Sequence, residues 1–373
     1  MGVFSTKSLQ GLTLSVAARG EVLLHLVSIR SLRAALIAAP FFLFGGASLA
    51  AMPSDNASQD EPKRTRKGAL ALVVDNDLFA RGSLDRDYSS GIEISYLTAP
   101  TQPPQWSERA IDFLARERET LETRFHFGLG HHIYTPEDIS LEIPAPNDRP
   151  YAGLLYGSVG AVLNQNDTRI DQLQLLFGVV GPVSQADSIQ IAYLRLINAE
   201  DPRGWDNQIS NRPAFELSWR RTQIANLIGD KGLPGFKVQF APHYGARVGN
   251  LKTAANLGAT VRFGWNPPID ITPATLKPSL PGAALFKPTA KWGWYVYSGV
   301  DGRYIPQNIF LDGMPRSDDG VTRRNFTGDV ILGLAFYRGP VRVGYTHFVR
   351  TRQYDEQNRD GSEYGSFSVA VNF

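Results

Sequence analysis

Short segments in which apolar and polar residues alternate constrain the fold of this chain more than any other feature of its sequence. Residues 92–96 (IEISY) and 341–349 (VRVGYTHFV) alternate in this way, and in residues 367–373 the odd positions are apolar and the even positions small or polar. Side chains on a β-strand point to opposite faces in turn, so each segment predicts a strand with one apolar and one polar face. The pattern indicates an all-β protein.

The first fifty residues have the pattern of a signal peptide. Arg30 and Arg33 precede an apolar run over 34–44, and small residues follow at 47–51, which predicts cleavage after Ala50. The run is shorter than the roughly 20 residues of a spanning helix, although a membrane anchor is the alternative. The long stretch before Arg30 leaves the true start codon open. We therefore expect a signal peptide over 1–50, a polar disordered spacer over 51–67 and the folded part over 68–373.

Export and alternation together favour an outer-membrane barrel over a soluble sandwich. In a barrel the apolar face of each strand meets lipid, and the polar face lines the lumen. The sequence predicts a 12-stranded antiparallel transmembrane β-barrel with both ends on the periplasmic side. The expected strands lie near 69–79, 88–98, 123–134, 152–163, 170–180, 214–224, 235–248, 254–264, 292–303, 325–337, 341–350 and 363–373.

Three connections between these strands have a character of their own. Residues 106–122 predict a short amphipathic helix on the periplasmic side, and the proline-containing stretch 266–289 predicts a long irregular excursion. Residues 187–197 have helical spacing, with Ile189, Tyr193, Leu196 and Ile197 on one side. This helix lies in an outer loop, where it covers a site or acts as a plug.

Charge and cysteine content exclude several functions. The chain carries 38 basic and 36 acidic residues, for a net charge of +2, whereas a nucleic-acid-binding protein needs a basic face to neutralise phosphates. We therefore expect no nucleic-acid partner. The chain has no cysteine, which excludes disulfides, cysteine-ligated zinc and thiol nucleophiles.

Oxygen-bearing side chains gather where the first two strands reach the outer rim. Asp75, Asn76 and Asp77 close the first segment, and residues 85–91 (DRDYSSG) open the second. Carboxylate and amide oxygens are the ligands of hard cations such as calcium. A plain turn is the alternative, because aspartate and asparagine are also common turn residues.

These stretches carry a resemblance to a known family. The chain resembles the lipid A 3′-O-deacylase family of outer-membrane barrels over roughly 68–373. The resemblance implies a twelve-stranded barrel that removes an acyloxyacyl group from lipid A by calcium-dependent hydrolysis, at a site between the outer wall and the loop helix. The partner it implies is lipid A or lipopolysaccharide, and we expect a monomer. The matching strings are DNDLF (75–79), DRDYSSG (85–91), IYTP (133–136), DRPYAG (148–153), GWDNQ (204–208), NIFLDG (308–313) and YTH (345–347).

The family's functional residues can be carried over one position at a time. The five positions that agree with the family pattern are Asn76, Asp77, Ser89, Gln190 and Glu200. Asp77 and Glu200 are the expected carboxylate ligands of calcium. The family's catalytic histidine falls on Leu194, which has no titratable group. Help from a general base is worth about 10²–10⁴ in rate, so the resemblance implies weak activity unless another base serves.

His132 is the expected substitute base, because it adjoins the IYTP string and shares a strand face with His126 and Tyr134. A histidine hydrogen-bonded in the lumen or at the interface is the alternative for that residue. Tyr193 is a poorer base, since an unperturbed phenol has a pKa near 10. Two functions stay open: a lipid A deacylase, and a catalytically disabled barrel with a lipid-binding or structural role. Passive transport is a weaker third.

Overall fold

A computed structural model describes residues 68–81, 90–105, 108–114, 120–229, 234–271, 283–313, 320–357 and 361–373. The expected signal peptide and spacer lie outside these residues. Within the described ranges, no helix has the length and apolar character needed to cross a membrane.

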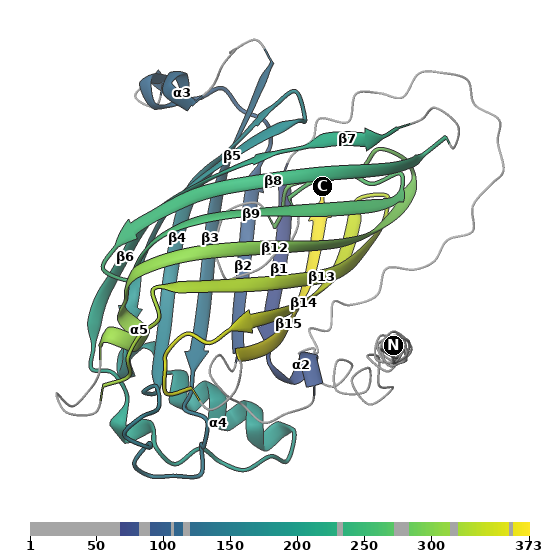
Figure 1. Ribbon diagram of the computed structural model, residues 1–373. Helices are drawn as coiled ribbons and strands as arrows, with labels where there is room; N and C mark the ends of the chain where they lie inside the picture. Colours follow the sequence, from purple (N-terminus) through teal and green to yellow (C-terminus); the bar gives the residue numbers. More distant parts are fainter. Residues whose placement is uncertain are drawn as a thin grey trace, which may run out of the picture. The chain divides into compact units, whose positions relative to one another are not determined.

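Twelve long antiparallel strands of the described chain form a closed barrel (Figure 1). β15 pairs with β1, and β6 pairs with β8, so the sheet returns to itself. The prediction of a 12-stranded barrel is confirmed. The strands are β1 (Gly68–Asn76), β2 (Ser90–Thr98), β3 (Leu121–Tyr134), β4 (Ala152–Gln165), β5 (Arg169–Val180), β6 (Arg212–Gln223), β8 (Phe236–Gly249), β9 (Lys252–Trp265), β12 (Trp292–Asn308), β13 (Phe326–Arg338), β14 (Val341–Thr351) and β15 (Gly361–Asn372).

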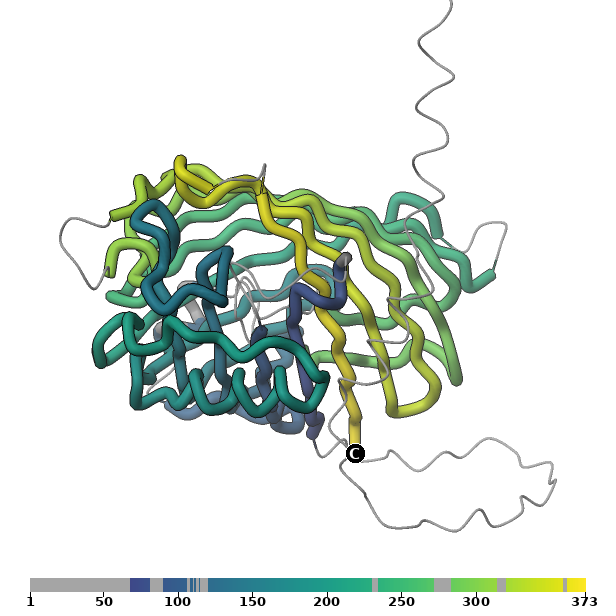
Figure 2. The backbone as a smooth tube through the Cα atoms, turned by 90° about the horizontal axis from the view of Figure 1, so that it is seen from below, coloured from purple at the N-terminus to yellow at the C-terminus, as the bar shows by residue number. Residues whose placement is uncertain are grey.

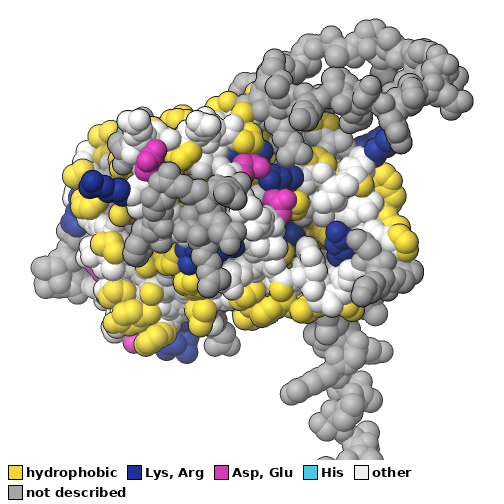
Figure 3. Space-filling model, turned by 90° about the horizontal axis from the view of Figure 1, so that it is seen from above, with side chains coloured by type: hydrophobic (Ala, Val, Ile, Leu, Met, Phe, Trp, Pro, Cys, Tyr) yellow, Lys and Arg dark blue, Asp and Glu magenta, His cyan; other side chains and the backbone are white. Residues whose placement is uncertain are grey.

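Strict alternation fixes which face of each strand points outward. On β13, Val330, Leu332 and Leu334 are each 55% exposed, whereas Asp329 and Ile331, on the other face, are each 2% exposed. Burial of an apolar side chain is favourable by about 25 cal/mol per Å², so an apolar outer surface of this extent needs lipid around it. Apolar side chains also follow much of the edge of the molecule in Figure 3.

The two ends of the barrel differ in their connections (Figure 1). At one end, which we call the terminal end, Gly68 and Phe373 exchange backbone hydrogen bonds. The same end holds α3 (Glu108–Leu114), which confirms the helix expected between the second and third strands, and the short strand β7 (Ala225–Ile228). The opposite end, which we call the loop end, holds α2 (Leu78–Arg81), α4 (Ala186–Leu196) and α5 (Ile309–Asp312).

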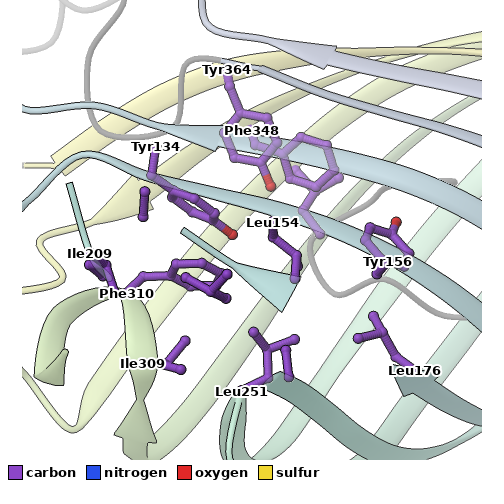
Figure 4. Close-up of a cluster of buried hydrophobic side chains, with 14 of the residues drawn as sticks. Tyr134, Leu154, Tyr156, Leu176, Ile209, Leu251, Ile309, Phe310, Phe348 and Tyr364 are labelled. Carbon is purple, nitrogen blue, oxygen red and sulfur yellow. The ribbon is translucent and has the colours of Figure 1, made fainter. Parts of the chain in front are cut away.

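Side chains fill the interior at both ends. Near the loop end, Tyr134 stacks on Phe310 with ring centroids 4.0 Å apart, within a cluster that includes Leu154, Tyr156 and Leu176 (Figure 4). Between the apolar clusters lie buried ion pairs, which satisfies the rule that buried charges are paired. The interior is therefore a packed core with polar layers.

The excursion between β9 and β12 packs inside the barrel at its described ends. β10 (Ile269–Asp270) pairs with β11 (Phe286–Lys287). Asp270 is 1% exposed and accepts hydrogen bonds from Arg262, Arg342 and Tyr295, all on barrel strands. The sequence predicted only an irregular excursion here. The segment is held in the lumen by ion pairs between Asp270 and arginines on barrel strands. Such long-range pairs cannot be predicted from local periodicity.

Candidate functional site

Helix α4 lies against the outside of the wall at the loop end. It contacts β3 and β4, and Figure 2 shows it along one side of the barrel mouth. Ala186 packs with Ile133 and Trp205 in a buried cluster. Gly153 permits this approach, because a Cβ at that position would overlap Ser184 and Ala186. The helix is thus fixed on the wall at the place that the resemblance implies for a site.

The buried face of α4 repeats every fourth residue. Ala186, Gln190 and Leu194 are the buried residues of the helix, as expected when residues i and i+4 share a face. Asp187 lies in the first turn and Arg195 in the last turn. Each charge interacts favourably with the helix dipole at its end and so stabilises the helix. Gln190 Oε1 accepts a hydrogen bond of 2.9 Å from Trp205 Nε1. Gln190 therefore ties the helix to the loop that follows it.

Leu194 and Glu200 line one cavity of about 790 Å³, which we call the outer cavity. Leu78, which directly follows Asp77, also lines it. Leu194 is 3% exposed, so its side chain lies within the packed floor of this space. The remaining lining residues come from the loops after β3, α4 and β14: Glu137, Asp138, Ile139, Ser140, Leu141, Ala145, Asn147, Asp148, Ile197, Ala199, Tyr354 and Glu356.

The outer cavity is rich in carboxylates. Its lining includes five acidic residues, namely Glu137, Asp138, Asp148, Glu200 and Glu356, and no lysine, arginine or histidine of the described chain. Burial raises the pKa of Glu356, but two hydrogen bonds from Thr322 outweigh it and hold that pKa below its usual value. A set of oxygen donors without cations is suited to a hard cation such as calcium. The described residues do not contain a preformed group of three metal-ligating side chains.

Asn76 and Asp77 lie at the rim beside α2. Each is 4% exposed, and Asn76 Oδ1 accepts a 2.8 Å hydrogen bond from the Leu78 backbone N–H. Asn76 pairs with Ser90 across the ladder, Ser90 pairs with Ile133, and directly paired residues share a face. Asn76 therefore faces outward, in the same row as the Ile133 side chain beneath α4. Ser89 lies outside the described residues.

His132 lies on the other side of the wall. It is 4% exposed and faces the lumen, where its Nε2 lies 3.4 Å from the Tyr156 hydroxyl, which donates to Glu93. Its side chain lines a separate inner cavity and does not line the outer cavity that Leu194 and Glu200 share. Its hydrogen-bonded position in the lumen corresponds to the alternative considered for it.

His131 is the histidine that sequence reasoning passed over. It faces outward, is 7% exposed, and its Nε2 lies 3.0 Å from the Ser184 carbonyl oxygen just before α4. A carbonyl only accepts, so Nε2 donates and Nδ1 keeps its lone pair. Phe127 and Leu129 lie four and two residues before His131, so they share its strand face. Because both are apolar, they indicated from the sequence that His131 faces outward.

Comparisons with known proteins agree with the barrel fold. A family model described as outer membrane protein LpxR matches residues 42–373. The structure is similar to that of LpxR from Salmonella typhimurium, with 20% sequence identity, a TM-score of 0.67, and coverage of 82% of this chain and 100% of that chain. The β domain of the Bordetella autotransporter BrkA gives 9% identity and a TM-score of 0.42 over 83% of this chain and 100% of that one. No curated protein matches the sequence.

Proposed function

The chain belongs to the family of the outer membrane protein LpxR, and from that premise we propose that its outer cavity handles lipid A as a deacylase-type site. It is an outer-membrane β-barrel, with the loop end as the outer end. The proposed reaction is calcium-dependent hydrolysis of the ester that carries the 3′-acyloxyacyl group of lipid A. One observation supports the proposal most directly. Leu194, Glu200 and Leu78, the residue after Asp77, all line the same cavity at the outer rim.

The proposed roles follow from the chemistry of each side chain. Asp77 and Glu200 would hold calcium, which when bound would stabilise the charge that develops on the ester oxygen. Asn76 and Ser89 would orient the ester group by hydrogen bonding. Gln190 acts through position, because its bond to Trp205 holds α4 over the wall.

The proposed rate is low, because the residue that faces the cavity from α4 is leucine. Leu194 offers apolar surface to an acyl chain and has no atom that accepts a proton. A missing general base costs about 10²–10⁴ in rate. Slow or absent turnover with retained lipid binding is therefore the expected behaviour.

A disabled barrel is the second candidate, and the buried Leu194 favours it. In this account the outer cavity binds the acyl chains of lipid A, and the protein has a lipid-binding or structural role. Both accounts place a monomer in the outer membrane, since the twelve long strands close on themselves through the pairing of β6 with β8 and of β1 with β15.

Mass spectrometry of lipid A from cells with and without the protein tests the reaction. The proposal predicts a species lighter by the 3′-acyloxyacyl group, at low abundance, only where the protein is present. Identical spectra at high expression would contradict the hydrolase proposal and favour the disabled barrel. Heat-modifiable migration on a gel after detergent extraction verifies in the same cells that the barrel is folded.

A further inference from the structure

A second hollow lies inside the barrel at the loop end, and we call it the inner cavity. Its volume is about 50 Å³. Four of its lining residues are basic, namely Arg247, Lys252, Arg303 and Arg350, and Glu216 is the acidic residue among the described ones. Its apolar wall includes Leu154, Leu176, Leu251 and Phe310, which Figure 4 labels.

The ion pairs around this cavity leave one basic residue of its lining unpaired. Glu216 lies 3.0 Å from Arg247, and Asp329 lies 2.7 Å from both Arg303 and Arg350. Asp301 lies 2.7 Å from Arg303 and 3.2 Å from Arg220. Glu216 thus pairs with Arg247, and Asp301 and Asp329 pair with Arg303 and Arg350. Lys252 is the basic residue of the described lining that none of these carboxylates pairs with.

Two donors in the lining have no partner among the described residues. The side-chain ammonium of Lys252 makes no ion pair or hydrogen bond with the described residues. The Thr327 hydroxyl is buried, with the residue 6% exposed, and it has no hydrogen-bond partner there either. A buried hydroxyl left without a partner costs about 1–3 kcal/mol, so a ligand that accepts its hydrogen bond is favoured.

We propose that the inner cavity is a binding site for a phosphate group. A phosphate carries negative charge to place beside the unpaired Lys252 ammonium, and its tetrahedral oxygens accept from arginine, lysine and hydroxyl donors together. The volume of about 50 Å³ is several times the roughly 10–15 Å³ that one water needs, which gives room for a small oxyanion. The phosphate belongs either to a free ion or to a lipid headgroup at the mouth, and both have the same chemistry.

Equilibrium dialysis of the detergent-purified full chain with radiolabelled inorganic phosphate tests the site. Wild type should bind about one phosphate per chain with saturation. Lys252→Met should bind at least about tenfold more weakly, because a charged hydrogen bond is lost. The matched control is Lys237→Met. Lys237 lies on β8 near the terminal end of the barrel and does not line the cavity, so this variant should bind phosphate as wild type does.

Thermal unfolding provides a second measurement. Phosphate at constant ionic strength should raise the unfolding midpoint of wild type and Lys237→Met but leave Lys252→Met unchanged. Without phosphate, Lys252→Met should unfold at a higher temperature than wild type, because it removes one uncompensated charge. Unsaturable binding, or equal binding by wild type and Lys252→Met, would overturn the proposal.

Competition identifies the source of the phosphate. Displacement of the label by phosphorylated lipid A, and not by its dephosphorylated form, assigns the site to a headgroup. Displacement by neither lipid assigns it to the free ion. The proposal is independent of ester hydrolysis, since every measurement reads binding or stability and none reads turnover.

Discussion

The outer and inner cavities lie at the same end of the barrel and differ in charge. The outer cavity has five carboxylates and no basic residue in its described lining, whereas four basic residues and one carboxylate line the inner cavity. His131 and His132 are adjacent on β3 and face opposite sides of the wall, His131 toward the segment before α4 and His132 into the lumen beside the inner cavity. The difference teaches that loops outside the strands and side chains inside the barrel can give opposite charge to two cavities at one end of the same molecule.

The largest expected effect tests whether the inner cavity depends on its charges. Asp329→Asn should lower the free energy of unfolding by about 3–5 kcal/mol, because it removes the buried carboxylate that Arg303 and Arg350 share. Urea unfolding in detergent micelles measures it. The control is Asp201→Asn in the exposed pair with Arg195, which should cause no measurable loss. Equal stability of Asp329→Asn and wild type would contradict a charge-dependent lumen.

The next effect tests whether the outer cavity lacks only a base. Leu194→His should raise acyl release by about 10²-fold or more, because it places an imidazole beside the other predicted site residues. Release of the acyl chain from lipid A in calcium-containing detergent is the assay, and Leu194→Met is the apolar control.

The histidines of the two faces sharpen the same assay. His132→Ala should leave turnover unchanged, since His132 lies in the lumen, and any residual wild-type turnover should depend on His131 beside α4. Robust wild-type activity that His132→Ala abolishes would refute this assignment. If Leu194→His is also inactive, the result would favour the disabled-barrel hypothesis.

A smaller effect concerns calcium. Asp77→Ala should weaken calcium binding at least about tenfold, because the proposed site loses one of its two charged oxygen ligands. Isothermal titration of the purified protein measures the affinity. Glu216→Gln, in the inner cavity, should bind calcium as wild type does. Equal affinities for wild type and Asp77→Ala would remove Asp77 from the cation site.

The smallest effect concerns the attachment of α4. Trp205→Phe removes the hydrogen bond to Gln190 and should cost about 1 kcal/mol of local stability. Amide hydrogen exchange in residues 186–196 should quicken severalfold, while exchange in the strands that surround the inner cavity stays constant. Uniform quickening across the barrel would instead mean that the helix and the wall unfold together.

Most of the barrel could be predicted from periodicity. The segment expected over 152–163 is β4 (Ala152–Gln165), and the helix expected over 187–197 is α4 (Ala186–Leu196). Alternation is a local property that extends over whole strands, so a single sequence reveals it. The entry of 266–289 into the lumen was missed, because it depends on pairs such as Asp270 with Arg342, 72 residues apart.

The site was predictable only in part, for the same reason. Gln190 and Leu194 share a face of α4, as i and i+4 spacing requires. The apolar side expected from Ile189 and Leu196 is not the buried one, because these residues are 48% and 71% exposed. The carboxylate lining was not foreseen, because loops distant in the sequence form it: Tyr354 donates to Asp148 across 206 residues. Alternation separated His131 from His132, and the apolar residues Phe127 and Leu129 on the face of His131 marked that face as the outward one.

The pairing of β1 with β15 joins residues from opposite ends of the described chain, with Asn76 opposite Gly365. A ribosome that stops before residue 361 would release a sheet with two open edges, whose backbone groups lipid cannot satisfy. Loss of β15 alone would therefore leave the barrel open, because β15 joins β14 to β1 and no other pairing of the described strands closes the sheet at that point.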